Sequence, residues 1–247
     1  MAPEQGFFEA FYASPAQHPA LLWAAAALAT LAALRRPGLA PSLRRYLLAL
    51  GLLSLADAWT NVTVRYLVPV DAWLTANQVP VIGRLDGVSA RAVPLFFVLA
   101  GDFRFLLLLG AADASGRFRL GARAVGGALA LALVVPLVSQ AVVLGLGREE
   151  PRVLFLVYEL AFFALTVALL RGHPGLHRAP WLASVCRFVL LYYGLWAAAD
   201  AVILTTGSDL GFALRVVPNV LYYGGLIAAI AWAAPLPGGL EPDARPS

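Results

Sequence analysis

The chain lacks lysine altogether and has one cysteine, one methionine and three histidines among its 247 residues. Without lysine no Schiff base can form, which disfavours a retinal-binding opsin. The single Cys186 excludes an intrachain disulfide. His18 stands alone, and Pro174 and Gly175 are expected to break the helix that would place His173 and His177 on one face. We therefore predict neither a metal site nor a cofactor.

Charge is also scarce. Only 13% of the residues are charged, whereas 61% are hydrophobic, and the mean hydropathy is +0.78. Soluble domains average about 25% charged residues. Such a chain cannot cover a water-facing surface, so we predict an all-α integral membrane protein in a bacterial inner (cytoplasmic) membrane, with the lipid bilayer as its main partner. The net charge of +4 is explained by cytoplasmic loops and does not indicate nucleic-acid binding.

Long apolar runs predict seven transmembrane helices. Arginine is the only basic residue type, and its distribution predicts the orientation. The segments 35–45, 111–123 and 171–187 with the C-terminal tail carry 11 arginines, whereas the alternate segments carry 6. Because basic residues favour the cytoplasmic side, the N-terminus is expected outside and the C-terminus inside. The expected spans are 18–34, 46–62, 92–110, 124–146, 153–170, 188–206 and 216–234.

One stretch occurs twice. LLALGLLSLADAWT begins at Leu47 and LLYYGLWAAADAVILT at Leu190, and in each an aspartate follows a glycine by six residues. Upstream, LRRPGL at 34–39 matches RGHPGL at 171–176 in its Pro-Gly-Leu. The pattern predicts a parallel 3+1+3 internal repeat, with the fourth helix as the linker. The expected parts are an N-terminal interfacial arm (1–17), a first repeat (18–110), a linker loop and fourth helix (111–146), a second repeat (147–234) and a disordered tail (235–247).

Isolated acids inside these apolar runs indicate a site. A carboxylate in hydrocarbon costs roughly 2.5 to 3.5 kcal/mol on insertion scales, so it usually faces the bundle interior and often marks function. The alternative is a helix-to-helix hydrogen bond that only aids packing. The repeat favours an acidic, aromatic-lined cavity that opens outward. The candidate substrate- or ion-binding residues are Asp57, Asn61, Asp102, Glu159, Asp200, Asn219 and Tyr222.

Two further expectations concern groups outside this set. In the N-terminal arm, Phe7 and Phe11, like Phe8 and Tyr12, are four residues apart and share a helix face, which predicts an aromatic band in the membrane interface or else a frayed terminus. Arg104 lies near the inner end of its span and is expected to snorkel toward the inner interface.

Two family resemblances accompany this pattern. With the 3+1+3 arrangement, PNVLYYGGL at 218–226 resembles the start of the seventh helix in SWEET sugar transporters and their PQ-loop relatives. That resemblance implies a carrier in which Asn219 contacts the substrate. GLLSLADAW, GLWAAADAV and LYYGGLIA are similar to segments of the YhhN-type lysoplasmalogenases. This second resemblance implies a lipid enzyme in which Asp57 and Asp200 are the functional acids.

Three functions follow as hypotheses. The first is a small-solute or cation/proton-coupled carrier that uses the intramembrane acids. The second is an intramembrane lipid-modifying enzyme with an acid pair as general acid and base. The third is a non-catalytic seven-helix receptor or assembly subunit, whose plain fourth span would face a partner subunit. The sequence therefore leaves open whether the protein is an enzyme.

Overall fold

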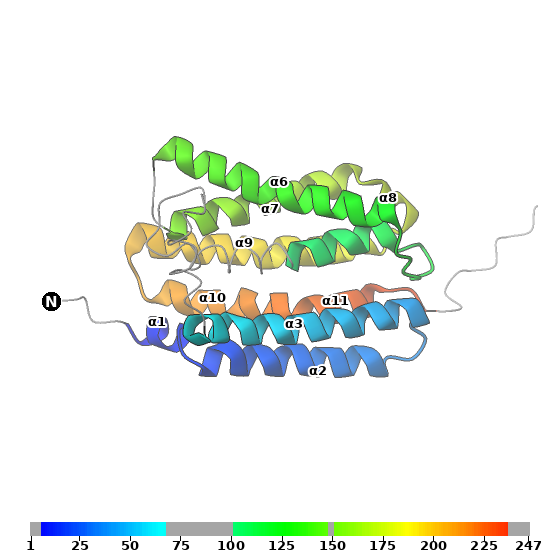
Figure 1. Cartoon of the computed structure of the whole chain (residues 1–247), viewed down its shortest axis with the longest axis horizontal. Coiled ribbons are helices and arrows are strands. Elements are labelled where there is room, and N and C mark those ends of the chain that lie inside the picture. Colours follow the sequence, from blue (N-terminus) through cyan, green and yellow to red (C-terminus); the bar gives the residue numbers. More distant parts are fainter. Residues whose placement is uncertain (1–5, 68–100, 148–150, 237–247) are drawn as a thin grey trace, which may run out of the picture.

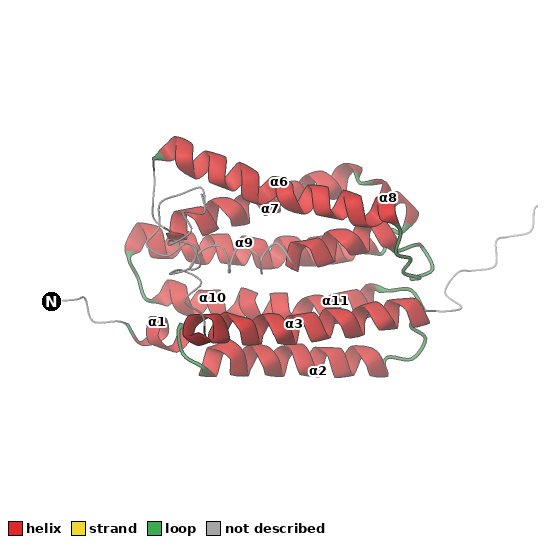
Figure 2. Ribbon diagram, in the orientation of Figure 1, coloured by secondary structure: helices red, strands yellow, loops and turns green. Residues whose placement is uncertain are grey.

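The computed structural model describes residues 6–67, 101–147 and 151–236, and these ranges are almost wholly helical (Figure 2). No strand forms within them, and the only β-type pairing there is an isolated bridge between Ala112 and Phe118. The expected all-α architecture is confirmed. The end of the tail, 237–247, lies outside the described residues.

Five helices within the described ranges are long and apolar enough to cross a membrane. Helices of 20 to 25 residues extend about 30 to 38 Å at 1.5 Å per residue, which matches a hydrocarbon core of about 30 Å. The chain is therefore a polytopic membrane protein. The five are Ala16–Arg35, Ala122–Leu146, Arg152–Gly172, Leu182–Thr206 and Leu210–Ala233.

Two other expected spans are described in part. Helix α3 (Pro41–Leu67) has 27 residues but is less apolar than the five. The third expected span lies partly outside the described residues, and its described portion is the helical segment 101–111. The number of seven crossings and the division into repeats stay predictions.

The remaining elements divide or extend these spans. A short helix α1 (Phe7–Tyr12) and a wide helical turn η1 (Ala16–Leu21) precede α2 (Leu22–Arg35). The last span runs as α10, a wide π-type turn η2, and α11. Pro218 lies within it and lacks the N–H that an α-helix needs, which accounts for irregular winding nearby. The other helices are α6 (Ala122–Leu146), α7 (Pro151–Gly172), α8 (Pro174–Arg178), α9 (Leu182–Thr206), α10 (Leu210–Val220), η2 (Leu221–Gly225) and α11 (Leu226–Ala233).

The helices pack in a sequence of neighbours around the segment 101–111. Helix α2 contacts α3, η2 and α11; α9 contacts α10, α11 and α7; and α7 contacts α6 (Figure 1). The segment 101–111 packs inside this arrangement, where Phe105 lies edge-on to Phe162 of α7 and Leu108 and Leu109 are fully buried. Side chains on this segment can therefore reach several helices at once.

The connections expected on the inner side meet at one end of the bundle. The backbone N–H of Phe118 donates to Ser42 Oγ at 3.0 Å, and Trp181 Nε1 donates to the carbonyl of Asp113 at 3.0 Å. Arg36 Nη2 donates to the carbonyl of Ala234 at 3.3 Å. These bonds tie together the segments that carry most of the arginines. We call this the basic end; its orientation in the membrane stays a prediction.

The helix is interrupted at the histidine pair, as expected. Helix α7 ends at Gly172, His173 is extended, and Pro174 begins the separate short helix α8, because proline fits a first helical turn. His173 is its N-cap, and Nδ1 of His173 accepts a hydrogen bond from the N–H of Gly175 at 3.0 Å. Within the described ranges, no three histidine, cysteine or acidic side chains gather as metal ligands would.

Candidate functional site

Charged side chains gather in the interior of this apolar bundle, which makes the interior the candidate site. Two networks can be distinguished. We name them the central network (Asp57, Asp102, Arg104 and Tyr222) and the outer network (Arg152, Glu159, Asp200 and Arg215). Among these side chains Asp102 and Asp200 are almost completely buried, with 1% and 0% exposed.

The central network is built on the segment 101–111. Asp102 and Arg104 are two residues apart, so they project about 200° apart around a helix and face different neighbours. Arg104 faces α3 and η2. Its Nη1 donates to Ser54 Oγ at 2.9 Å, its Nη2 donates to the Tyr222 hydroxyl at 3.2 Å, and the same Nη2 lies 3.8 Å from Asp57 Oδ2. Arg104 therefore does not snorkel to the interface, because a buried carboxylate pairs with it inside the bundle.

Asp102 faces the other side of the segment. One carboxylate oxygen accepts a short hydrogen bond from the Tyr158 hydroxyl of α7, and the other accepts one from the Tyr193 hydroxyl of α9. The segment thus joins α3 and η2 through Arg104 to α7 and α9 through Asp102. The network therefore has one carboxyl group paired with a guanidinium, Asp57, and one held by two hydroxyl groups, Asp102.

Gly101 keeps the space that Tyr222 occupies. A Cβ atom at position 101 would overlap the Tyr222 hydroxyl, and it would lie 2.9 Å from Cε2 of the same ring. Only a residue without a side chain allows this ring to approach the helix and reach Arg104. The Tyr222 hydroxyl can therefore reach Arg104 only because residue 101 is glycine.

The outer network lies one to two turns from the ends of α7, α9 and α10. Arg215 of α10 forms an ion pair with Asp200 of α9, and its Nη1 also lies 3.2 Å from Oε1 of Glu159 on α7. Arg152 adds a second ion pair to Asp200, at 2.9 Å. Its side chain is 27% exposed, and its guanidinium stacks 4.8 Å from the ring of Phe212. Two acids and two arginines balance one another here.

The N-terminal arm closes over the outer network. The hydroxyl of Tyr12 accepts hydrogen bonds from Arg215 Nε at 3.2 Å and from Asn219 Nδ2 at 3.3 Å. Asp209 holds the start of α1, because its carboxylate accepts from the N–H groups of Phe8 and Glu9 at 2.8 and 2.7 Å. One member of the expected aromatic band is corrected: Tyr12 turns into the bundle because two buried donors meet its hydroxyl. Phe7 and Phe8 are exposed, and their place in the membrane interface stays a prediction.

An aromatic layer connects the two networks. Trp196 Nε1 donates to Asn219 Oδ1 at 2.8 Å, and the Trp196 ring lies 5.2 Å from the ring of Tyr222. Asn219 and Tyr222 are three residues apart and share a helix face. From Arg215 to Tyr222 the chain rises about 10 Å along the helix at 1.5 Å per residue. Polar groups therefore continue from the outer end to the middle of the bundle.

The structure thus brings most of the predicted residues into the interior. Asp57, Asp102 and Tyr222 belong to the central network, and Glu159 and Asp200 belong to the outer one. Asn219 lies between them, and the side chain of Asn61 lies outside the described residues. Asp57 and Asp200 do not pair with each other, because each pairs with its own arginine.

Sequence reasoning missed four members of the site. Arg104, Arg152 and Arg215 had been assigned to interfaces and loops, and Tyr12 to a surface band. One available signal was the spacing of Arg215, Asn219 and Tyr222, which places all three on one helix face. No protein-family model, no curated protein and no solved structure matches the chain. Function is therefore argued from this geometry alone.

Proposed function

We propose that this membrane protein is a small-solute or cation carrier coupled to protons or a monovalent cation, and that the central network binds the coupling ion. One observation carries the proposal: Asp57 and Asp102 are both buried in the bundle, Asp57 in an ion pair with Arg104 and Asp102 hydrogen-bonded to two tyrosine hydroxyls. Within the described residues, an ionised Asp102 forms no ion pair.

An excess charge in the interior is costly. An ion removed from water loses several kcal/mol of solvation unless a partner neutralises it. A proton on Asp102, or a bound monovalent cation, neutralises this charge. The site would then alternate between two charge states, as a coupling-ion site requires. The two tyrosine hydroxyls on Asp102 keep its oxygens hydrogen-bonded in the ionised state.

The outer network acts as the closed outer gate in this proposal. Arg215 holds α7, α9, α10 and the N-terminal arm together, and Arg152 faces the water at the rim. Opening requires these ion pairs to separate so that water reaches Asn219 and the aromatic layer. Rocking of one repeat against the other would supply that motion.

The acids of the duplicated stretch fit the internal repeat within this proposal. Asp57 and Asp200 occupy equivalent places in that stretch. Each forms an ion pair with an arginine of another helix, Asp57 with Arg104 and Asp200 with Arg215. The two arginines do not occupy equivalent places, because RVVP at 215–218 corresponds to RAVP at 91–94. The two three-helix units would be the rocking parts.

The test separates ion binding from transport. Infrared titration of the purified protein should show a protonated-carboxyl C=O band that disappears as the pH is raised and that is weaker in D57N or D102N. D113N, which makes the same carboxyl-to-amide change in a loop at the basic end, should leave the band unchanged. Uptake driven by a pH gradient into liposomes is then screened by solid-supported membrane electrophysiology with amino acids, sugars and amines.

Three outcomes would contradict the proposal. The first is a wild-type protein with no titrating buried carboxyl group. The second is solute-driven current that persists unchanged in the D57N/D102N double variant. The third is hydrolysis of lysophospholipids or vinyl-ether lipids at high protein loading, since that product would instead support the enzyme hypothesis.

A further inference from the structure

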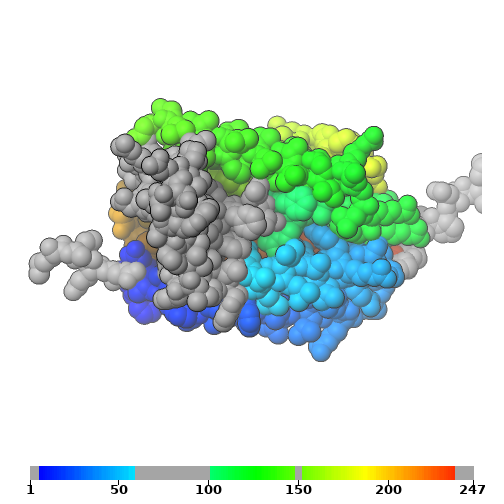
Figure 3. All heavy atoms as spheres, viewed as in Figure 1, coloured from blue at the N-terminus to red at the C-terminus, as the bar shows by residue number. Residues whose placement is uncertain are grey.

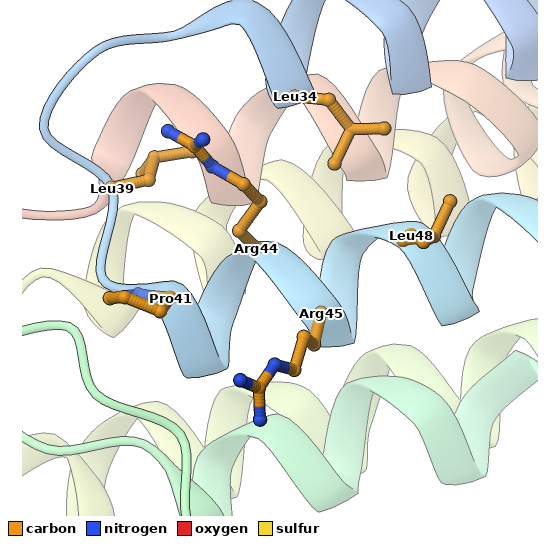
Figure 4. A pocket seen from close by; sticks show the side chains of 6 residues that line it. All are labelled: Leu34, Leu39, Pro41, Arg44, Arg45 and Leu48. Carbon is orange, nitrogen blue, oxygen red and sulfur yellow. The ribbon is translucent and has the colours of Figure 1, made fainter.

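A groove of about 440 Å³ opens between α2 and α3 at the basic end (Figure 4). It lies outside both networks of the candidate site. Its walls combine hydrocarbon with positive charge and contain no acidic residue. The lining residues are Leu34, Leu39, Pro41, Arg44, Arg45 and Leu48.

The groove exists because the two helices touch farther along. At Gly51 the helices approach so closely that a Cβ atom there would lie 2.7 Å from Cγ2 of Thr30. About one turn nearer the basic end, Leu34 and Leu48 stand on the two sides of the groove. The loop 36–40 then turns the chain around before Pro41 begins α3. The close packing of α2 against α3 at Gly51 therefore does not extend to the basic end, and the groove lies where it stops.

Two arginine side chains at the mouth of the groove carry positive charge. Arg44 Nη2 donates to the carbonyl of Arg36 at 3.2 Å, which directs the side chain toward the 36–40 loop. Arg45 also lines the groove, and its guanidinium points in a different direction from that of Arg44 (Figure 4). Within the described part of the chain, neither Arg44 nor Arg45 forms an ion pair. The first turn of α3 adds the positive end of a helix dipole.

Hydrocarbon continues from the groove along the surface of the bundle. On α3, Leu48 and Leu52 are four residues apart and are 42% and 57% exposed. On α2, Leu28 and Leu31 are three residues apart and are 67% and 49% exposed. The blue and cyan atoms of α2 and α3 form this open face in Figure 3. An acyl chain that leaves the groove would lie against leucine side chains.

We propose that this groove binds one anionic phospholipid from the surrounding leaflet. Its phosphate lies by Arg44, with Arg45 as the second positive charge, and its glycerol backbone and acyl chains pass between Leu34 and Leu48. A membrane phospholipid combines the negative charge and the hydrocarbon that these two surfaces require. Basic pockets between transmembrane helices are a recurring form of lipid recognition.

The test compares two pairs of arginines at the same end. The full-length protein is purified in mild detergent and titrated with phosphatidylglycerol or phosphatidylcholine, and bound lipid is counted by native mass spectrometry. Each arginine near an anionic lipid is worth about a fivefold change in affinity. R44Q/R45Q should therefore weaken phosphatidylglycerol binding roughly 30-fold. R117Q/R119Q removes the same charge from an exposed loop at that end and should change binding less than about threefold.

Several results would overturn the proposal. Unchanged phosphatidylglycerol affinity in R44Q/R45Q would show that the lipid does not bind in this groove. An equal loss in R117Q/R119Q reduces the effect to general charge attraction. Equal affinity for phosphatidylcholine would show that the groove does not prefer anionic lipids. Displacement of the lipid by millimolar inorganic phosphate would show that the groove binds a free anion rather than a lipid. If the double variant does not fold, R44Q and R45Q are measured singly, with about fivefold expected for each.

Discussion

Replacing Arg215 with glutamine should destabilise the protein more than replacing Arg152 with glutamine. Arg215 neutralises both Asp200 and Glu159, and it also donates to Tyr12. Removing one partner of a buried ion pair costs about 3 to 5 kcal/mol, because the other charge is left without compensation. Arg152 still neutralises Asp200 in the variant, so Glu159 is the stranded charge and the expected cost lies near 3 kcal/mol.

The expected loss is measurable as a melting temperature. For a chain of this length, 1 kcal/mol corresponds to about 2 to 4 °C, so R215Q should melt roughly 10 °C lower in detergent. R152Q is the matched control. Its side chain is partly exposed, and loss of a water-screened pair costs about 1 kcal/mol or less. R152Q should therefore melt only about 2 to 4 °C below the wild type.

A double variant separates charge from packing. R215Q/E159Q removes the stranded acid together with the arginine, and Asp200 keeps Arg152. If the loss in R215Q is electrostatic, the double variant should recover about 2 kcal/mol, a usual coupling for residues in contact. A melting temperature for R215Q within 3 °C of wild type would refute the reasoning, as would strictly additive effects of the two changes.

The remaining predictions use different parts of the molecule. Gly51→Ala should cost about 1 to 3 kcal/mol by thermal melting, because the new methyl group meets Thr30, whereas Gly126→Ala has open space and should be neutral or slightly stabilising; equal effects would contradict this account. Tyr12→Phe removes the hydroxyl that accepts two buried donors, so it should speed protease cleavage of the N-terminal arm several-fold, and unchanged cleavage would argue against that anchor. Partial burial raises the pKa of Asp113, but hydrogen bonds from Ser115 and from the backbone N–H groups outweigh it and hold that pKa below its usual value. A depressed pKa contributes stability above about pH 4 that is lost as the pH falls, so amide exchange in this turn should rise more steeply on acidification in the wild type than in D113N.

The sequence was sufficient for the properties that depend on composition and spacing. Low charge and long apolar runs predicted an all-α membrane protein, and the five described spans end within about two residues of the expected ends. The spans Leu182–Thr206 and Leu210–Ala233 begin about six residues earlier than expected, which brings Arg215 into a helix. The cost of a carboxylate in hydrocarbon was enough to place Asp57, Asp102 and Asp200 in the interior. These inferences need no knowledge of which helices are neighbours.

Predicting which acid each arginine pairs with requires knowing which helices are neighbours. The side chains of Arg104 and Arg215 are long enough to extend either to water or to an acid on a neighbouring helix. Their positions in the sequence do not show which of the two they reach. The choice depends on whether a carboxylate lies across the helix interface, which only packing decides. Tyr12 is a similar case, because Asp209, almost two hundred residues later, fixes the arm that carries it. Local spacing therefore predicted the faces of the helices but not their contacts.

The difference between the two networks supports the division of roles proposed for them. Each contains an aspartate of the duplicated stretch that is paired with an arginine of another helix. The outer network adds one acid, Glu159, and one arginine, Arg152, so its charges cancel. In the central network Asp102 is held by tyrosine hydroxyls and forms no ion pair within the described residues. A balanced cluster gains nothing from binding an ion and is suited to hold helices together, whereas a carboxylate without an ion pair is neutralised by a proton or cation. The neutral outer cluster therefore fits a gate, and the central cluster fits the coupling site.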